Sequence, residues 1–329
     1  MLEKTMKKVL TRQINKWLAT ITDDDVREAA AKDLIVTGGC FTSMILNEDV
    51  NDIDCYFRTK GTVVKVAEYY ANVWNESRGE QRNAIDKITK VFVLDGASPS
   101  QEILDYYGVK DLKDSPAVMV SNCAPERVKI IFPSDGIVGR QDEEGDTLDP
   151  LSMVEEVDEV KVDEVEEAEP RDYVPVFMST NAITLSRGVQ IVVRFYGEPD
   201  EIHDTYDFEH CKAFYDHGKR VLSIPNGVYE ATINKTLIYT GSRYPVCSVF
   251  RLRKFIGRGW HINAGQILKM CMQISAIDLL DIDVLEDQLI GVDSLYFMQL
   301  IEQFRKKQSE DDGFTLTAPY LLSVIDKIF

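Results

Sequence analysis

Apolar residues recur every three or four positions through the first 21 residues, MLEKTMKKVLTRQINKWLATI. This spacing predicts an amphipathic helix with Val9, Ile14, Leu18 and Ile21 on its buried face. The same periodicity predicts a second helix over residues 64–76, VKVAEYYANVWNE. Residues 87–96, KITKVFVLDG, have the pattern of a strand, and residues 116–136 predict two strands joined by a turn.

The second half of the chain changes from strands to helices. Residues 188–197, GVQIVVRFYG, are rich in β-branched residues and predict a strand. A short helix is expected over 198–206, a strand over 207–216 and a hairpin partner over 217–225. From about residue 232 the pattern is helical, over 234–241, 244–260, 263–281, 292–307 and 318–329. We therefore expect an α+β fold, with a mixed-sheet head over 1–235 and an all-helical C-terminal domain over 236–329. The head would carry an insertion at about 60–178.

Charge is distributed unevenly along the 329 residues. The net charge is −18, and the stretch from Asp142 to Asp172 holds 15 acidic residues against Lys161 and Arg171. This stretch contributes −13 and leaves −5 for the rest, so a local basic groove for nucleic acid is compatible with the composition. We expect a flexible acidic segment at 140–173; the alternative is an acidic flap that mimics nucleic acid.

Several classes of protein are disfavoured by the sequence. No apolar run approaches the roughly 20 residues that cross a bilayer, and the start lacks the pattern of a signal peptide. The six cysteines include no CxxC pair and fit reduced thiols. We therefore expect a cytoplasmic protein without a membrane partner. Three clustered histidines beside Cys211 match no familiar zinc spacing.

Candidate chemistry is concentrated in residues 35–58, IVTGGCFTSMILNEDVNDIDCYFR. Gly38 and Gly39 follow an apolar strand and precede a short helix, where free backbone N–H groups favour phosphate, and the hydroxyl of Ser43 adds a donor. Asp52 and Asp54 stand two residues apart on the next strand, so both carboxylates project from one face. Their repulsion would be relieved by Mg²⁺ (or Mn²⁺), which takes carboxylates together with substrate phosphates. A solvated strand edge is the plainer alternative.

These motifs resemble the DNA polymerase β-like nucleotidyltransferase superfamily, above all the head domains of poly(A) polymerases and CCA-adding enzymes, in a phage or viral branch. The residues concerned are VTGGCFTSMILNEDVNDIDCYF, TYDFEHCKAFYD (205–216) and SVFRLRKFIGRGWHI (248–262), in the family's order. One departure is Phe41-Thr42-Ser43, where CCA-adding members usually have an Arg-Asp pair after the glycines.

The resemblance implies roles for particular residues. Asp52, Asp54 and Asp207 would be catalytic metal ligands, with Glu209 as the runner-up for the third position. Gly38, Gly39, Ser43, Arg251, Lys254 and Arg258 would bind the nucleotide. Asp281 and Asp283 repeat the Asp-x-Asp spacing without a glycine turn, and we interpret them as unrelated.

The function implied is transfer of a nucleoside monophosphate from an NTP to an acceptor hydroxyl with release of pyrophosphate, most simply at an RNA (tRNA) 3′ end. Two alternatives stay open. One is a catalytically silent binding or virion-associated structural protein, and the other is a nucleotidyltransferase toxin that modifies protein or tRNA.

Overall fold

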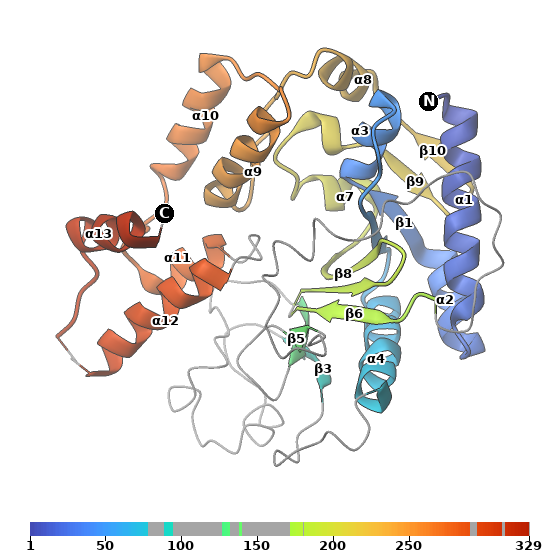
Figure 1. Cartoon of the computed structure of the whole chain (residues 1–329), viewed down its shortest axis with the longest axis horizontal. Helices are drawn as coiled ribbons and strands as arrows, with labels where there is room; N and C mark the ends of the chain where they lie inside the picture. Colours follow the sequence, from blue (N-terminus) through green and yellow to red (C-terminus); the bar gives the residue numbers. More distant parts are fainter. Residues whose placement is uncertain are drawn as a thin grey trace, which may run out of the picture.

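The fold is organised around an eight-stranded sheet with the strand order β10-β9-β1-β2-β8-β7-β6-β5 (Figure 1). It is seen in a computed structural model that describes residues 1–77, 89–94, 127–131, 138–139, 172–179, 181–289, 295–310 and 313–328. The strands are β1 (Leu34–Thr37), β2 (Ile53–Phe57), β5 (Val138–Gly139), β6 (Pro175–Met178), β7 (Ala182–Leu185), β8 (Val189–Tyr196), β9 (Phe214–Asp216) and β10 (Val221–Ser223). β2 and β8 are parallel, whereas the other pairs in this sheet are antiparallel. A separate ribbon pairs β3 (Lys90–Leu94) with β4 (Arg127–Ile131).

The alternation of residues in β2 separates a core face from a polar face. Ile53, Cys55 and Phe57 belong to the main hydrophobic core, because residues two apart on a strand share a face. Asp54 and Tyr56 lie on the opposite face, where Tyr56 packs in a smaller cluster with Ile202. The sequence of β2 therefore sends its carboxylate away from the main core.

Three helices contribute many side chains to the main hydrophobic core. They are α1 (Glu3–Thr20), α2 (Asp24–Asp33) and α4 (Lys60–Ser77). In α1 the side chains of Met6, Leu10, Ile14, Trp17 and Leu18 are buried. The Trp17 indole donates a buried hydrogen bond of 2.7 Å to the Tyr70 hydroxyl and so connects α1 to α4. On the polar face of the sheet lies the short helix α7 (Pro199–His203), which contributes Ile202.

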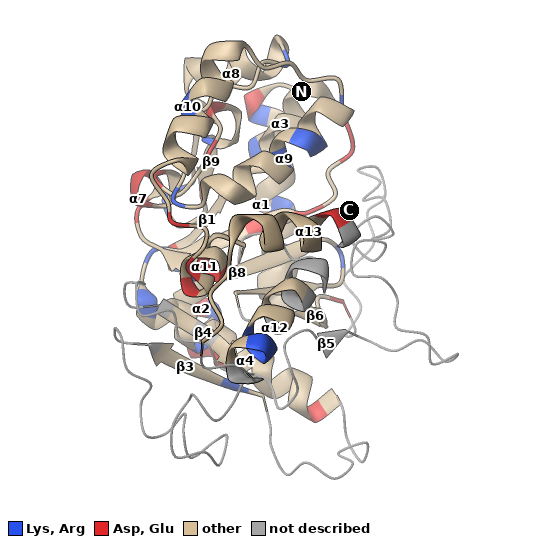
Figure 2. Cartoon of the chain, turned by 90° about the vertical axis from the view of Figure 1, so that its left-hand side faces the viewer, with Lys and Arg blue, Asp and Glu red and all other residues tan. Residues whose placement is uncertain are grey.

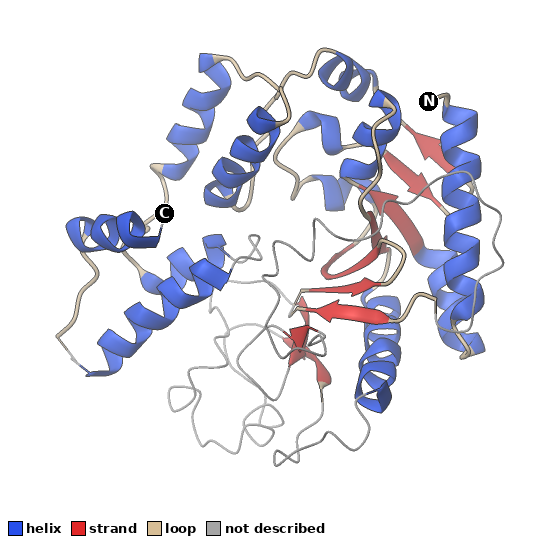
Figure 3. Cartoon of the chain, viewed as in Figure 1, coloured by secondary structure: helices blue, strands red, loops and turns tan. Residues whose placement is uncertain are grey.

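After β10 the regular elements of the described chain are helices (Figure 3). They are α8 (Asn226–Ile233), α9 (Pro245–Gly257), α10 (Ala264–Ile274), α11 (Ile282–Leu289), α12 (Leu295–Glu310) and α13 (Ala318–Ile328). α11, α12 and α13 form their own apolar cluster, which includes Leu285, Phe304 and Val324. None of the helices in the described ranges is long and apolar enough to cross a membrane.

Most of the predicted elements are confirmed. The N-terminal helix is α1, with Ile14, Leu18 and Ile21 buried as expected, although Val9 is only partly buried. The 64–76 helix is α4, the 188–197 strand is β8 and the 198–206 helix is α7. The α+β class is thus correct, while the boundary near 235 between two domains stays a prediction.

Three predictions require correction, and two others lie outside the described residues. The strand expected over 207–216 is interrupted by the 3₁₀ turn η3 (Glu209–Cys211), so only β9 is extended. Residues 234–241 form no helix, because Thr236 and Tyr239 make isolated bridges to His261 and Phe208. Residues 60–77 of the expected insertion are α4, which packs in the main core. The acidic segment over 140–171 and the first predicted strand of 116–136 lie outside the described residues.

Candidate active site

The turn between β1 and α3 (Gly39–Leu46) is shaped by a glycine. Gly38 has φ 111°, a conformation that residues with a Cβ atom rarely adopt, and it caps α3 without a side-chain hydrogen bond. A Cβ atom at Gly38 would lie 2.8 Å from Oδ2 of Asp54, whereas one at Gly39 would meet nothing within 4 Å. The start of α3 therefore touches the Asp54 carboxylate on one side and is open at Gly39.

The carboxylates of Asp52 and Asp54 form a strained electrostatic pair. Asp52 is exposed and Asp54 is half-buried. Asp54 is the register partner of Gln190 on the neighbouring parallel strand β8. Burial and the negative charge of Asp52 raise the pKa of Asp54 well above its usual value, and Lys254 partly offsets this. The surrounding protein removes part of the hydration of Asp52, which still reaches solvent, and this raises its pKa against the opposing charge of Lys254. The pair thus lacks the positive charge that would make both ionised forms stable.

The donor set suits a hard divalent cation shared with a substrate. Mg²⁺ and Mn²⁺ prefer oxygen ligands, and Mg²⁺ is commonly held by one or two carboxylates together with phosphate oxygens. The Asp54 carboxylate lies next to the open N-terminus of α3, and the charges of both Asp52 and Asp54 act on Cys40 of that helix. Within the described ranges no group of three or more His, Cys, Asp or Glu side chains is arranged to hold a metal. The remaining ligands would have to come from the substrate and water.

Asp207 is engaged by a cation, and no cluster of three carboxylates suited to a metal includes it within the described residues. Its role as the third metal ligand stays a prediction. Asp207 lies in a bend outside the sheet, and its buried carboxylate accepts a 2.6 Å hydrogen bond from Arg251 of α9. The carboxylate is thereby neutralised by a guanidinium, which leaves it a poor candidate for a metal ligand. Glu209, the runner-up, begins the 3₁₀ turn η3 and does not share a strand face with Asp207.

The three predicted cations of α9 have different surroundings. Lys254 is exposed, and its charge lowers the pKa of both Asp52 and Asp54. Arg251 is bound to Asp207, and Arg258 donates a 2.7 Å hydrogen bond to Glu48. Lys254 is therefore the predicted cation that acts directly on the carboxylate pair. Ser43, which was predicted to donate its hydroxyl to the nucleotide, lies one turn into α3 and is buried.

Sequence reasoning missed the tyrosines around the pair. The Tyr206 hydroxyl is buried and lies 3.7 Å from the position that a Cβ at Gly38 would take. Its ring packs against Tyr56, with centroids 6.3 Å apart. The pKa of Tyr56 is raised by burial and by the charge of Asp54. The alternation of β2 could have indicated Tyr56, whereas nothing local to residue 206 indicates its place beside Gly38.

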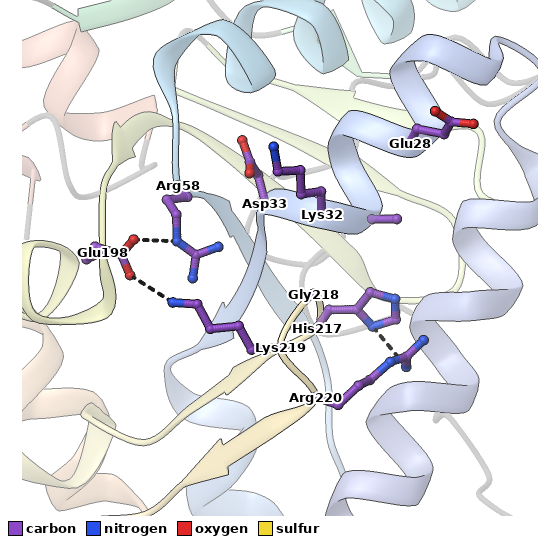
Figure 4. A pocket seen from close by; sticks show the side chains of 10 residues that line it. Glu28, Lys32, Asp33, Arg58, Glu198, His217, Gly218, Lys219 and Arg220 are labelled. Carbon is purple, nitrogen blue, oxygen red and sulfur yellow. Dashed lines mark hydrogen bonds and ion pairs between the residues drawn. The ribbon is translucent and has the colours of Figure 1, made fainter.

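A pocket of about 670 Å³ lies at the other end of β1 and β2 (Figure 4). It is lined by Glu28, Ala31, Lys32, Asp33, Arg58, Glu198, His217, Gly218, Lys219 and Arg220. Glu198 accepts from Arg58 at 2.5 Å and lies 3.6 Å from Lys219, and Arg58 also binds Asp216. Two of its cations are thus neutralised by carboxylates, so this pocket is a weaker candidate for a polyphosphate than the Gly38 turn.

Comparison with known protein families identifies the chain. Residues 8–235 match the model of Gad2, the Gabija anti-defense 2 family. The match spans well over half of the chain, which therefore belongs to this family. No curated protein and no solved structure matches.

The family match corrects the resemblance drawn from the sequence. Membership of the polymerase β-like nucleotidyltransferase superfamily is wrong as a family assignment, because the matching family is an anti-defense family whose model covers both 35–58 and 205–216. The local motifs that suggested the resemblance are real features of the Gly38 turn and of β2. Their chemistry depends on the geometry of that turn and strand.

Proposed function

We propose that this member of the Gabija anti-defense 2 family is a metal-dependent nucleotidyltransferase, and that it counters the Gabija defence by transferring a nucleoside monophosphate from an NTP to an acceptor hydroxyl. The observation that carries the proposal is the contact between Gly38 and Asp54. It brings a carboxylate from β2 against the uncapped N-terminus of α3, with open space at Gly39. An anion-binding helix end and a cation-binding pair thus share one location, which is the requirement for binding a metal–triphosphate.

The chain's own groups have distinct tasks in this proposal. Backbone N–H groups at the start of α3 hold phosphate oxygens, and Lys254 contributes a positive charge that acts on the pair. Asp52 and Asp54 would hold Mg²⁺ or Mn²⁺, which when bound neutralises charge on the phosphates. The acceptor oxygen attacks the α-phosphorus, the bond from that phosphorus to the bridging oxygen breaks, and pyrophosphate leaves. The hydroxyl proton passes to solvent, to which the exposed Asp52 is open.

The acceptor we propose is the 3′ hydroxyl of an RNA. The feature that supports a polyanion is Lys254 of α9, an exposed cation whose charge acts on the carboxylate pair, whereas Arg251 and Arg258 are paired with Asp207 and Glu48. Figure 2 shows basic residues in blue on this helix. A hydroxyl on a protein is the alternative acceptor that the same experiment distinguishes.

The experiment incubates the purified protein with each α-labelled NTP, Mg²⁺ and either total RNA or a protein lysate. We expect label on RNA, and we expect Asp52→Ala plus Asp54→Ala to abolish it. The matched control is Asp281→Ala plus Asp283→Ala, which removes the same spacing of carboxylates from the start of α11 and should retain transfer. Label on protein instead of RNA would show that the acceptor is a protein hydroxyl. Label that persists in the variant lacking Asp52 and Asp54 would refute the assignment of the site.

A second candidate is a catalytically silent protein that binds nucleotide without transferring it. The observation in its favour is the Asp207–Arg251 ion pair, which leaves two carboxylates rather than three beside the Gly38 turn. Mg²⁺-dependent binding of a labelled NTP that depends on Asp52 and Asp54, without transfer to any RNA or protein, is the result that would favour it.

A further inference from the structure

The helices after residue 230 carry an unusual share of the exposed apolar surface. Ten large hydrophobic side chains are exposed in the described part of the chain, and six of them lie within residues 231–277. These six are Ile233, Val249, Ile256, Ile267, Leu268 and Met272. Scattered exposed apolar residues are normal, but such a concentration marks an interaction surface.

On α10 the exposed residues form one stripe. Ile267, Leu268, Cys271 and Met272 are spaced one, three and four residues apart and are all exposed, so they share one side of the helix. Leu268 is 59% exposed and Met272 is 66% exposed. The other side is held to the protein by Met270, which packs in the cluster of Phe208, Tyr239 and Trp260. Figure 1 shows α10 at the outer edge of the molecule, beside α9.

On α9 the apolar residues lie away from the carboxylate pair. Val249, Arg253 and Ile256 are exposed and stand four and three residues apart, so they share a side of α9. Lys254, which acts on Asp52 and Asp54, is turned about 100° from Arg253 around the helix axis. α9 packs on α10 through Leu252 and Phe255. We call Val249, Arg253 and Ile256 of α9 with Ile267, Leu268 and Met272 of α10 the outer α9–α10 surface.

The segment that contains this surface carries side-chain charge of one sign. Residues 231–277 contain seven Lys and Arg and no Asp or Glu, in a chain whose net charge is −18. Arg251, Arg258 and Lys235 are neutralised by Asp207 and Glu48. Arg253 lies between Val249 and Ile256, and Lys269 follows Leu268, so cations accompany the apolar side chains. A partner of complementary charge would be acidic.

The kind of apolar residue on this surface favours a protein partner over a nucleic acid. Single-stranded nucleic acid is bound by aromatic side chains on which bases stack, together with cations for the backbone. The six exposed residues are aliphatic or methionine, and Leu and Met gain by burial against another apolar protein surface. Methionine is also typical of surfaces that accept amphipathic helices.

We infer that the outer α9–α10 surface docks an acidic amphipathic segment of a partner protein, whose apolar side covers Ile267, Leu268 and Met272 and whose carboxylates pair with Arg253 and Lys269. This inference is independent of nucleotidyl transfer, because none of these five residues contacts the Gly38 turn or the carboxylate pair.

The test measures binding of two designed helical peptides to the whole protein by fluorescence anisotropy. Both carry leucine on one side; one has glutamate and the other lysine on the remaining positions. We expect the glutamate peptide to bind, with an affinity that falls as salt is raised. Leu268→Glu plus Met272→Glu should weaken its binding about tenfold or more, as loss of central apolar contacts does.

The matched control is Leu322→Glu, which places one such charge on a leucine of α13 as exposed as Leu268 and should bind the peptide normally, whereas Leu268→Glu alone should already weaken binding. Circular dichroism and thermal melts establish that each variant is folded. Three results would overturn the proposal. They are failure of the glutamate peptide to bind, equal binding of the lysine peptide, and displacement of the peptide by single-stranded RNA at lower concentration than by unlabelled peptide. Light scattering that shows a dimer lost in the Leu268 and Met272 variant would instead assign the surface to a second copy of the chain.

Discussion

The guanidinium of Arg251 lies 2.6 Å from the carboxylate of Asp207 and joins α9 to the bend that follows α7. Asp207 is almost fully buried, whereas Arg251 keeps partial contact with solvent. Asp207 directly follows Tyr206, which lies beside Gly38, and Arg251 precedes Lys254 by three residues on α9. The ion pair therefore anchors the helix that carries Lys254, whose charge acts on Asp52 and Asp54, and we predict that Asp207 is a positioning residue.

This role predicts how the two partners respond to substitution. Asp207→Asn leaves the guanidinium without its counter-charge, and Arg251→Met leaves a buried carboxylate unpaired. We expect each to lower the free energy of unfolding by about 1–3 kcal/mol, since one charge of the pair is partly solvated. The double variant should cost clearly less than the sum, because the residues act as one unit. Urea unfolding measures all three.

A metal-ligand role for Asp207 would give a different result. In that case Asp207→Asn would abolish stabilisation by Mg²⁺, while Arg251→Met would retain it. If Asp207 is a positioning residue, both variants should weaken the response to Mg²⁺ with NTP to a similar extent.

The repulsion between Asp52 and Asp54 predicts a response to cations. Mg²⁺ that binds only the folded chain should stabilise it by about 1.4 kcal/mol at ten times its Kd. Asp54→Asn removes one of the two charges, so the metal-free variant should melt above the wild type and lose the response to Mg²⁺. Thermal melts with and without Mg²⁺ and NTP measure both effects.

The control for this prediction is Asp283→Asn on α11. Asp283 is exposed and paired with Arg305, far along the chain from the candidate site. Its substitution should leave the response to Mg²⁺ intact. A wild-type protein that Mg²⁺ does not stabilise, with or without NTP, would remove the metal from the proposed function.

The elements that the sequence predicted correctly are those decided by local chemistry. β8 follows from a run of β-branched residues, and α1 from apolar residues spaced for one face of a helix. Gly38 and Asp54 are 16 residues apart and lie at the ends of two neighbouring strands, β1 and β2. Their proximity could therefore also be predicted from the sequence. The expectation that both aspartates lie on the strand was wrong for Asp52, which directly precedes β2, although its charge still acts on Asp54.

The ion pair of Asp207 could not be predicted from the sequence, because it depends on a choice between partners that are distant in sequence. Asp207 follows Asp54 by more than 150 residues, and its actual partner, Arg251, belongs to a helix that forms later in the chain. An unpaired buried carboxylate is costly, and a nearby guanidinium satisfies it without a metal. Hydrophobic periodicity contains no information about which of these partners the fold supplies.

The conformation of Gly38 predicts a sharp contrast between two adjacent glycines. Gly38→Ala places a Cβ 2.8 Å from Asp54 Oδ2 at a φ of 111°, so backbone strain and a clash both oppose folding. We expect a loss of about 1–3 kcal/mol in unfolding free energy. Gly39→Ala meets nothing within 4 Å and begins a helix, so its stability should be unchanged or slightly increased.

Nucleotide binding separates these two variants further. If phosphate occupies the open space at Gly39, then Gly39→Ala should weaken NTP binding in spite of its intact stability. Isothermal titration with an NTP and Mg²⁺ measures this. Full NTP affinity in Gly39→Ala would show that the start of α3 is not the phosphate site.

The imidazole of His210 predicts a loss of stability in acid. The ring is fully buried among Phe208, Phe255 and Trp260, and neither of its nitrogens has a hydrogen-bond partner. Burial lowers its pKa to about 4, against the opposing charge of Asp207.

The unfolded chain, with a histidine pKa near 6.5, therefore binds the proton first as pH falls. The contribution of His210 is complete above pH 6.5 and is lost progressively down to about pH 4. Between pH 7 and pH 5 we expect His210 to account for about 1–2 kcal/mol of lost stability. Urea unfolding at the two pH values should show a smaller difference for His210→Phe than for the wild type. Phe208→Leu, which alters the same cluster without a titrating group, should lower stability equally at both. A pH difference that His210→Phe leaves unchanged would mean that the buried imidazole is not the group that destabilises the fold in acid.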